Sequence, residues 1–145
     1  MTKIIITGSR RWYCIDLARR VIERLVAKYG DIQIIHGACE INGELAGVDA
    51  AFDHAAREIG LVPRPYPADW HGLGSSAGPR RNTQMVNAGA DLAIAIHKNI
   101  AWSRGTKDCA RKLIAANIST WLIDNEAGNL KRLNSKMLVS NYEMA

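Results

Sequence analysis

Glycine-bearing segments, at the predicted ends of strands and starts of helices, contain the residues that could do chemistry. They are Gly8, Ser9, Arg10, Gly37, Gly105 and Thr106. Turns at strand ends expose backbone N–H groups, and helix starts add a partial positive charge. When such groups gather at one edge of a parallel sheet, they form a binding site for phosphate or another anion. We therefore predict that the ligand is a nucleotide or another phosphorylated small molecule.

A second charged group lies at the start of a helix predicted over residues 79–88. Arg80, Arg81 and Asn82 fall in its first turn, where the helix dipole disfavours basic side chains. An anionic ligand would explain two arginines there. The alternative is a solvated pair that faces Asp69 or another acid.

Two further side chains could contact a nucleotide. Asp49 lies in the first turn of a predicted helix, where an acid is favourable anyway, but it could also accept hydrogen bonds from ribose hydroxyls. Trp70 lies in a long polar loop, where it could stack on a base, cover the pocket or anchor the loop on the core. His36 and His97 end two strands and are expected to be hydrogen-bonded scaffold rather than general bases.

The glycine segments do not match the standard nucleotide motifs. The Gly8–Arg10 turn is not GxGxxG, and it lacks the lysine of GxxxxGK[ST], so neither a dinucleotide-binding fold nor a P-loop is predicted. The alternatives are that this turn is a tight connection with a solvated arginine, and that Thr106 only caps its helix.

Composition limits the functional classes. The 145 residues are 48% apolar and 23% charged, which suits one globular domain, and the net charge is +5. We attribute the positive charge to an anionic small ligand first and to a polynucleotide second. Nucleic-acid binding is not expected, because aromatic residues make up only 6% of the chain and no basic run is interleaved with them.

The cysteines and the apolar runs point to a soluble protein of a reducing compartment, the cytoplasm. Three widely separated cysteines form neither a disulfide framework nor a zinc motif, so no metal and no cofactor is expected. Cys14 and Cys39 are expected to pack as small apolar residues. No run is long enough for a membrane span or a signal peptide.

The elements that must position these residues alternate along the chain. Apolar runs predict strands over residues 3–7, 32–36, 61–66, 91–96 and 118–123. Helical periodicity appears over residues 12–29, 47–59, 79–88 and 105–117. This alternation predicts an α/β fold, a Rossmann-like doubly wound parallel sheet of about five strands with helices on both faces.

The predicted strand order is 3-2-1-4-5, which reverses between the first and fourth strands. Ligands bind at that switch point, outside the carboxyl ends of the strands, where Ser9, Arg10, His97 and the Gly105–Thr106 helix start are expected to meet. Residues 1–123 are expected to form the domain. Residues 124–145 would be a C-terminal tail, either frayed or with a short helix over 136–143.

Taken in order, the motifs resemble those of a known family. They are Ile6-Thr7-Gly8-Ser9-Arg10, His36-Gly37 with Gly47-Val48-Asp49, Pro67-Ala68-Asp69-Trp70, Ala77-Gly78-Pro79-Arg80-Arg81-Asn82 with Met85, and Gly105-Thr106. This set resembles the YspA, or cpYpsA-related, branch of the SLOG superfamily (DUF2493-type). The resemblance implies a Rossmann-like fold, a nucleotide-derived ligand, and a homodimer or larger homo-oligomer. Such proteins are often encoded by phages and mobile elements.

More distant SLOG relatives include the lysine-decarboxylase-like phosphoribohydrolases, which release a base from a nucleoside monophosphate. Their pattern is an arginine at a helix start followed by PGGxGTxxE. Arg81 could match the arginine, but Cys109 holds the place of the glutamate. Asp108 is adjacent and is expected to point about 100° away from that place on a helix.

The resemblance therefore favours ligand binding over hydrolysis. If the chain is an enzyme, it implies an N-glycosidase with Arg81 and Asp108 as the catalytic candidates. A DNA-associated protein is a third alternative, because a further SLOG relative handles single-stranded DNA.

Overall fold

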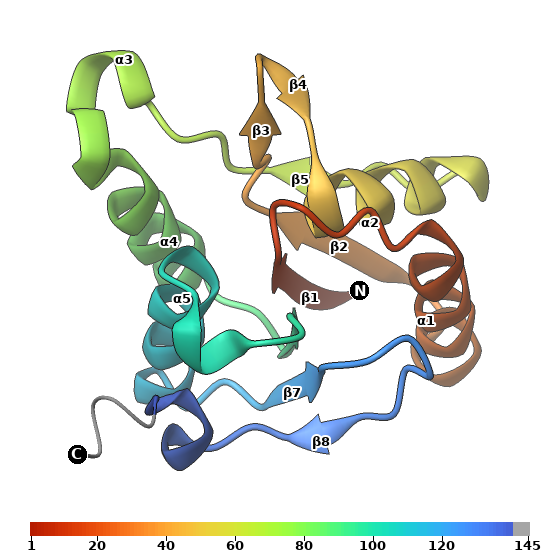
Figure 1. Cartoon of the computed structure of the whole chain (residues 1–145). Helices are drawn as coiled ribbons and strands as arrows, with labels where there is room; N and C mark the ends of the chain where they lie inside the picture. The colour runs from red at the N-terminus through yellow and green to blue at the C-terminus, as the bar shows by residue number, and fades with distance from the viewer. Residues whose placement is uncertain (141–145) are drawn as a thin grey trace.

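A mostly parallel six-stranded sheet forms the centre of the molecule, in a computed structural model that describes residues 1–140 (Figure 1). Its order is β5-β2-β1-β6-β7-β8. The strands are β1 (Thr2–Gly8), β2 (Ile32–His36), β5 (Arg64–Pro65), β6 (Leu92–Ile96), β7 (Thr120–Ile123) and β8 (Lys131–Arg132). The first five are parallel and follow the predicted order, so the Rossmann-like α/β fold is confirmed.

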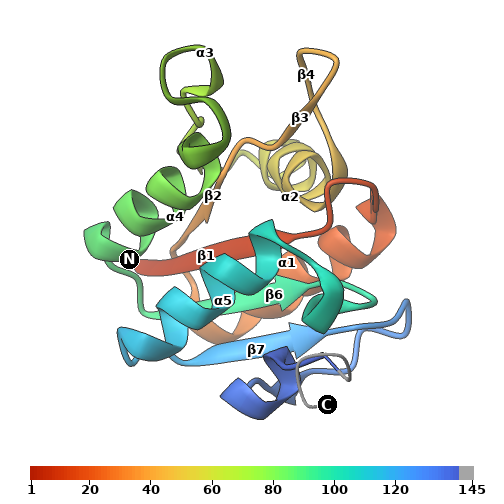
Figure 2. The ribbon, with the colours of Figure 1, turned by 60° about the vertical axis from the view of Figure 1, so that its left-hand side comes forward.

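Helices cover both faces of the sheet (Figures 1 and 2). Helices α1 (Ile15–Tyr29) and α2 (Gly47–Glu58) lie on one face, and α4 (Ala77–Ala88) and α5 (Gly105–Ala115) lie on the other. Alternate residues of β1 supply both cores, because side chains of a strand alternate between faces. Ile4 and Ile6 pack towards α1 and α2, whereas Ile5 packs towards α4 and α5.

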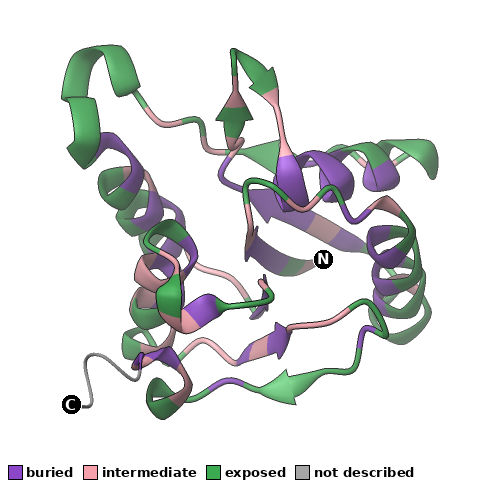
Figure 3. Ribbon diagram, in the orientation of Figure 1, coloured by how far each residue is buried: buried purple, intermediate pink, exposed green. Residues whose placement is uncertain are grey.

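The carboxyl ends of the central strands meet at one edge of the sheet. In the register, Gly8 of β1 lies opposite Ile96 of β6, and Ile96 lies opposite Ile123 of β7. Figure 3 shows that the central strands β1, β2 and β7 are largely buried, as are the inner sides of the helices, whereas the elements that rise above this edge are largely exposed. The connections that follow these strand ends form the rim of the candidate site.

The rim contains elements that the sequence did not predict. Residues 40–45, which lie between a predicted strand and a predicted helix, form a small antiparallel hairpin of β3 (Glu40–Ile41) and β4 (Glu44–Leu45). The polar loop before the third long helix contains α3 (Trp70–Leu73) and the 3-10 turn η1 (Gly74–Ser76). This turn leads directly into α4, which therefore begins two residues earlier than predicted.

The chain continues the fold beyond Ile123. Strand β8 pairs antiparallel with β7 as a sixth strand, and the 3-10 turn η3 (Ser135–Leu138) follows it. Leu133 and Leu138 are buried in a third apolar cluster with Ile100, which belongs to η2 (Ile100–Trp102). The end of the helix expected over residues 136–143 lies outside the described residues. Within residues 1–140, no helix is sufficiently long and apolar to cross a membrane.

Candidate functional site

A pocket of about 570 Å³ lies at the carboxyl ends of β1, β2 and β6. Among the residues that the sequence predicted for the site, all but one line it. They are Gly8, Ser9, Arg10, Gly37, Asp49, Trp70, Arg81, Asn82, Gly105, Thr106 and Asp108. The exception is Arg80, which is exposed and does not line the pocket. Segments up to 100 residues apart in the chain therefore meet on one concave surface.

The floor of the pocket depends on two close backbone approaches. A Cβ on Gly8 would lie 2.5 Å from the Ile96 carbonyl oxygen and 2.7 Å from the Val48 side chain. Gly47 has φ +63°, and a Cβ there would overlap the backbone of Ser9 and Arg10. The Val48 amide donates to the Ser9 carbonyl at 2.9 Å. Glycine at both positions lets the first turn pack directly against the start of α2.

Arg81 is held against the end of β2. Its Nη1 donates to the Gly37 carbonyl and, at 3.3 Å, to the Tyr66 carbonyl, and its Nε donates to Asn82 Oδ1 at 2.9 Å. A Cβ on Gly37 would lie 2.6 Å from Nη1 and 2.7 Å from Cζ, so only glycine leaves room for the guanidinium. Within the described part of the chain, no hydrogen bond uses Nη2. The guanidinium is thus fixed through Nη1 and Nε, and its Nη2 can donate to an anion.

The position of Arg81 in its helix differs from the prediction. Because α4 begins at Ala77, Arg81 lies at the start of the second turn rather than in the first. The repulsion between the positive end of the helix dipole and the Arg81 guanidinium, which was the reason to expect an anionic ligand, is therefore weaker than predicted. The partly buried contacts with two backbone carbonyls account for the place of Arg81, and the solvent-exposed Arg80 needs no further explanation.

Asn82 connects this arginine with Asp108, which among the described residues is the only acid of the lining besides Asp49. Its buried amide donates to Asp108 Oδ2 at 3.0 Å and to the Gly105 carbonyl at 3.3 Å. Lys112 Nζ also donates to Asp108 Oδ2, at 2.8 Å. These donors hold the Asp108 carboxylate beside the start of α5, where it lines the pocket.

Cys109, which holds the place of the glutamate of the phosphoribohydrolase pattern, is directed into the protein. It is wholly buried in the core beneath α4 and α5, and burial raises the pKa of its thiol to about 12. A neutral thiol in that position cannot stabilise a cationic transition state. The carboxylate that faces the pocket from this helix is the one of Asp108.

Asp49 is a buried acid with one oxygen that lacks a partner. The residue is 5% exposed, and its Oδ2 accepts a hydrogen bond from the Cys39 amide at 3.0 Å. Within residues 1–140, its Oδ1 has no hydrogen-bond partner. Burial raises the pKa of Asp49 above its ordinary value, although nearby His36, the Cys39 amide, Arg81 and the Gly37 amide lower it in part. A buried unpaired carboxylate oxygen is costly unless a ligand donates to it.

His36 is scaffold, as expected for a histidine at the end of a strand. It is wholly buried, its Nε2 lies 2.7 Å from Asp53 Oδ2, and its Nδ1 accepts from the Ala38 amide at 3.0 Å. Because Nδ1 is an acceptor, the ring proton is on Nε2 and is donated to Asp53. Ala38 has φ +50°, so this bond holds a strained loop in place beside the pocket.

The start of α5 supplies the second backbone contribution. Gly105 and Thr106 line the pocket in the first turn of an 11-residue helix, where amides have no intrahelical acceptor. No atom lies within 4 Å of a Cβ built on Gly105, so space is open beside its backbone. Arg104, at the N-cap, makes no side-chain cap, and Ser103 Oγ instead accepts from the Lys107 amide at 3.0 Å. This arrangement is suited to an anion.

Several lining residues were not predicted. Arg11 and Arg104 join Arg10 and Arg81 on the lining, so four guanidinium groups face two carboxylates. Cys39, expected to pack as an apolar residue, is only partly buried and accepts a hydrogen bond from Arg10 Nε at 3.2 Å. No local signal distinguishes these arginines from solvated ones, because the turns alone decide where they point.

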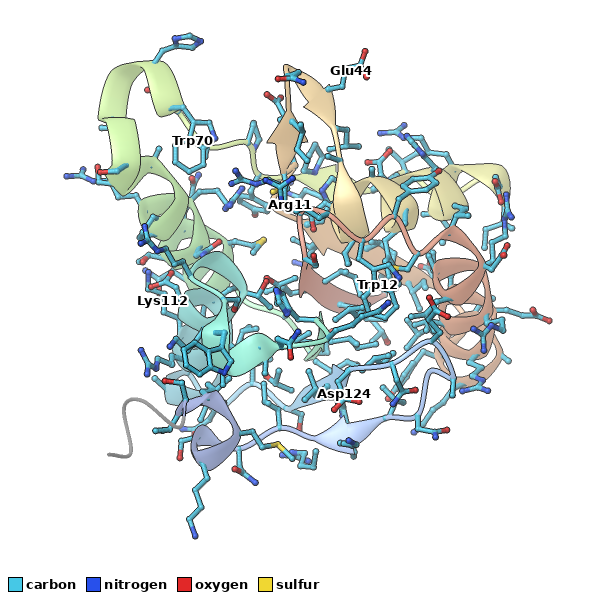
Figure 4. The ribbon with its side chains drawn as sticks, in the orientation of Figure 1. Arg11, Trp12, Glu44, Trp70, Lys112 and Asp124 are labelled. Atoms are coloured by element: carbon cyan, nitrogen blue, oxygen red, sulfur yellow. The ribbon has the colours of Figure 1, made fainter. Side chains whose placement is uncertain are left out.

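Trp70 forms part of the upper wall. Figure 4 shows its ring extending from α3 towards the space between α4 and the β3–β4 hairpin, on the side where Arg11 also lies. The ring packs on Gly78, where an added Cβ would lie 3.0 Å from it, and Trp70 remains 43% exposed. An aromatic face at the mouth of a pocket can stack on a planar group of a ligand.

His97 also lines the pocket, at the end of β6. Its Nδ1 accepts from the Asn99 amide at 2.9 Å, and burial lowers its pKa below the ordinary value. The imidazole is therefore neutral near pH 7, with its proton on Nε2. Among residues 1–140, no group of three or more histidine, cysteine, aspartate and glutamate side chains is arranged to hold a metal ion.

Comparisons with known proteins identify the family of this chain. Residues 2–72, which include the first turn, the β2 end and Asp49, match the model of the YAcAr family, described as the YspA, cpYpsA-related SLOG family. The "Gene 61 protein" of Mycobacterium phage D29 is 31% identical over 122 residues, which cover 81% of this chain and 93% of the phage protein. From these similarities we conclude that the chain belongs to the YspA, cpYpsA-related SLOG family.

Proposed function

We propose that the protein binds a nucleotide, or a phosphorylated compound derived from one, in the pocket at the carboxyl ends of the sheet. Family membership suggests a nucleotide-related ligand in general terms. The observation that carries the finer proposal is the fixed guanidinium of Arg81, which faces the same cavity as the open first turn of α5. A phosphate between them would receive charge-assisted and backbone hydrogen bonds together.

The size and charge of the lining support a small anion. A cavity of about 570 Å³ falls within the range of small-molecule sites. The four lining arginines exceed the two acids, so the local field attracts a negatively charged ligand. In this proposal Gly8, Ser9, Gly105 and Thr106 surround the phosphate, and the ring of Trp70 receives the base.

Isothermal titration calorimetry against ribonucleoside 5′-monophosphates, with the matching nucleosides, tests the proposal. The wild type is expected to bind at least one monophosphate and to bind its nucleoside at least tenfold more weakly. The double variant Arg81→Ala/Thr106→Ala is expected to lose this binding. Arg80→Ala is the matched control, because it removes one positive charge from the same helix outside the pocket. Absence of heat with every compound would refute the proposal.

A second candidate function is N-glycosidic cleavage of the bound nucleotide. The observation in its favour is that Asp108, rather than the buried Cys109, presents a carboxylate to the pocket. A carboxylate held there by Asn82 and Lys112 could stabilise a cationic sugar or activate water. Chromatography of each monophosphate after long incubation with the wild type and with Asp108→Asn separates the two functions. Base released by the wild type alone supports the enzyme, and unchanged substrate leaves only the binder.

A homodimer or larger homo-oligomer stays part of the proposal, as does the absence of nucleic-acid binding. Size-exclusion chromatography with light scattering tests the first. A mobility-shift assay with single-stranded DNA tests the second, and a shift that weakens steeply with salt would contradict it.

A further inference from the structure

The unpartnered oxygen of Asp49 indicates which part of a ligand reaches the bottom of the pocket. Asp49 is 5% exposed and lines the cavity, and the fixed Cys39 amide already occupies its Oδ2. Its Oδ1 has no donor within the described residues. A group that completes this site must bring a hydrogen-bond donor, and it cannot be an anion, because two negative charges would repel at short range.

This requirement divides the ligand into parts. A phosphate is excluded from Asp49, and the α5 start and Arg81 offer it donors elsewhere on the lining. Among the described residues of the lining, the only phenylalanine, tyrosine or tryptophan ring is that of Trp70, which is 43% exposed at the mouth, so a base stacked on it would lie near the solvent. The part of a nucleotide between phosphate and base is the sugar, whose hydroxyls are neutral donors.

We propose that Asp49 accepts a hydrogen bond from a ribose hydroxyl through Oδ1, and that the protein therefore binds a nucleotide that carries this hydroxyl more tightly than the deoxy analogue that lacks it. This inference rests on the proposed nucleotide-binding function and specifies its ligand. A site built to bond a hydroxyl rejects the analogue that lacks it, because the buried polar group is then left unpaired.

The neighbours of Asp49 determine what a substitution does. In Asp49→Asn, the Cys39 amide can pair only with the carbonyl oxygen, so the amide nitrogen takes the place of Oδ1. The variant keeps the shape of the side chain and replaces an acceptor by a donor at the position of the unpartnered Oδ1. The charge-assisted bond to the hydroxyl is lost, while the packing of α2 is preserved.

Asp53 offers a matched control on the same helix. It is buried as deeply as Asp49, at 6% exposure, but it bonds to His36 and Arg57 and does not line the pocket. Asp53→Asn should lower the unfolding temperature and keep the sugar preference. Asp49→Asn should not lower the unfolding temperature, and it should lose the preference. The two variants thus separate a role in ligand recognition from a role in the scaffold.

Calorimetry of wild type with each ribonucleoside 5′-monophosphate and with its 2′-deoxy and 2′,3′-dideoxy counterparts tests the inference directly. The dideoxy compound is expected to bind at least about tenfold more weakly than the ribonucleotide, and Asp49→Asn is expected to bring this ratio close to one. Equal binding of the three sugars by the wild type overturns the inference and leaves the proposed function standing. A wild-type ratio that Asp49→Asn does not change assigns the selection to another residue and also overturns it. If no monophosphate of either sugar binds, the proposed function fails and this inference fails with it.

Discussion

Gly37→Ala is the substitution that tests most specifically how the site is built. The new Cβ would lie 2.6 Å from Arg81 Nη1 and 2.7 Å from Cζ, and the three closest atoms all belong to that side chain. Because the obstacle is a flexible side chain rather than backbone, we expect the chain to fold and the guanidinium to move. The pocket is thereby changed without removal of any charged group.

The expected magnitudes follow from the bonds that Arg81 makes. Loss of its bonds to the Gly37 and Tyr66 carbonyls costs about 1–3 kcal/mol of unfolding free energy. This corresponds to a fall of about 2–10 °C in unfolding temperature for a chain of this size. Loss of a charge-assisted bond to the ligand phosphate would weaken binding by about 10- to 150-fold.

A double-mutant cycle with Arg81→Ala provides the decisive comparison. Thermal unfolding and calorimetry are measured for wild type, Gly37→Ala, Arg81→Ala and the double variant. Since the methyl group acts through the arginine, Gly37→Ala should have little further effect on binding once Arg81 is alanine. Wild-type affinity in Gly37→Ala, or additive losses in the double variant, would refute the reasoning that Gly37 positions Arg81.

Three further predictions concern titratable groups. Iodoacetamide at pH 8 should label Cys39 and spare Cys14 and Cys109, because burial raises the pKa values of these two thiols to about 11 and about 12. Peptide mass spectrometry identifies the labelled cysteines. Early labelling of either buried thiol would contradict the packing. Because burial raises the pKa of Asp49, its carboxyl stays protonated to a higher pH in the folded protein than in the unfolded chain. The contribution of Asp49 to the free energy of unfolding therefore falls as pH rises above about 4. Urea titrations should show Asp49→Asn gaining stability relative to wild type between pH 4 and pH 8, and a constant difference contradicts this. Burial also raises the pKa of Asp53, but the hydrogen bonds from Arg57 and His36 lower it by more than burial raises it. The pKa of Asp53 is therefore below its ordinary value. Its contribution is therefore present above pH 4 and lost as pH falls, and Asp53→Asn should cost about 1–3 kcal/mol at pH 7 and much less at pH 3, as urea titrations at the two pH values would show.

The sheet was predictable because its signals are local. Each central strand is a short β-branched or apolar run, and each helix has a distinct apolar stripe, so alternation and right-handed crossovers leave few topologies. Strand β8, by contrast, consists of the exposed Lys131 and Arg132 at an edge. It has no alternating pattern, and only its pairing with β7 makes it a strand. The β3–β4 hairpin is equally short and turns through Asn42 and Gly43 with positive φ.

The candidate site was predictable only in outline. The glycine turns and Asp49 could be located from the strand ends, and the structure brings them together with Arg81 and Thr106 on one cavity. The contacts that give these residues their properties connect distant segments. The Gly37 carbonyl that holds Arg81 is 44 residues away from it in the chain. Local sequence patterns cannot predict a hydrogen bond between residues so far apart.

Asp108 illustrates the same limit. The helical spacing predicted that it would point about 100° away from the residue that replaces the glutamate. The rotation of α5 on the sheet then determines which of the two faces the ligand. The helix buries Cys109 against β1 and β6 and leaves Asp108 beside the cavity, and this rotation depends on packing rather than on the local sequence.

A crystal structure of the protein soaked with its tightest-binding ribonucleoside 5′-monophosphate would test the central claim most directly. We expect phosphate oxygens within hydrogen-bond distance of the Gly105 and Thr106 amides, with Arg81 Nη2 on the same group. A nucleotide ordered on another surface, or one whose phosphate turns away from the start of α5, would contradict the account.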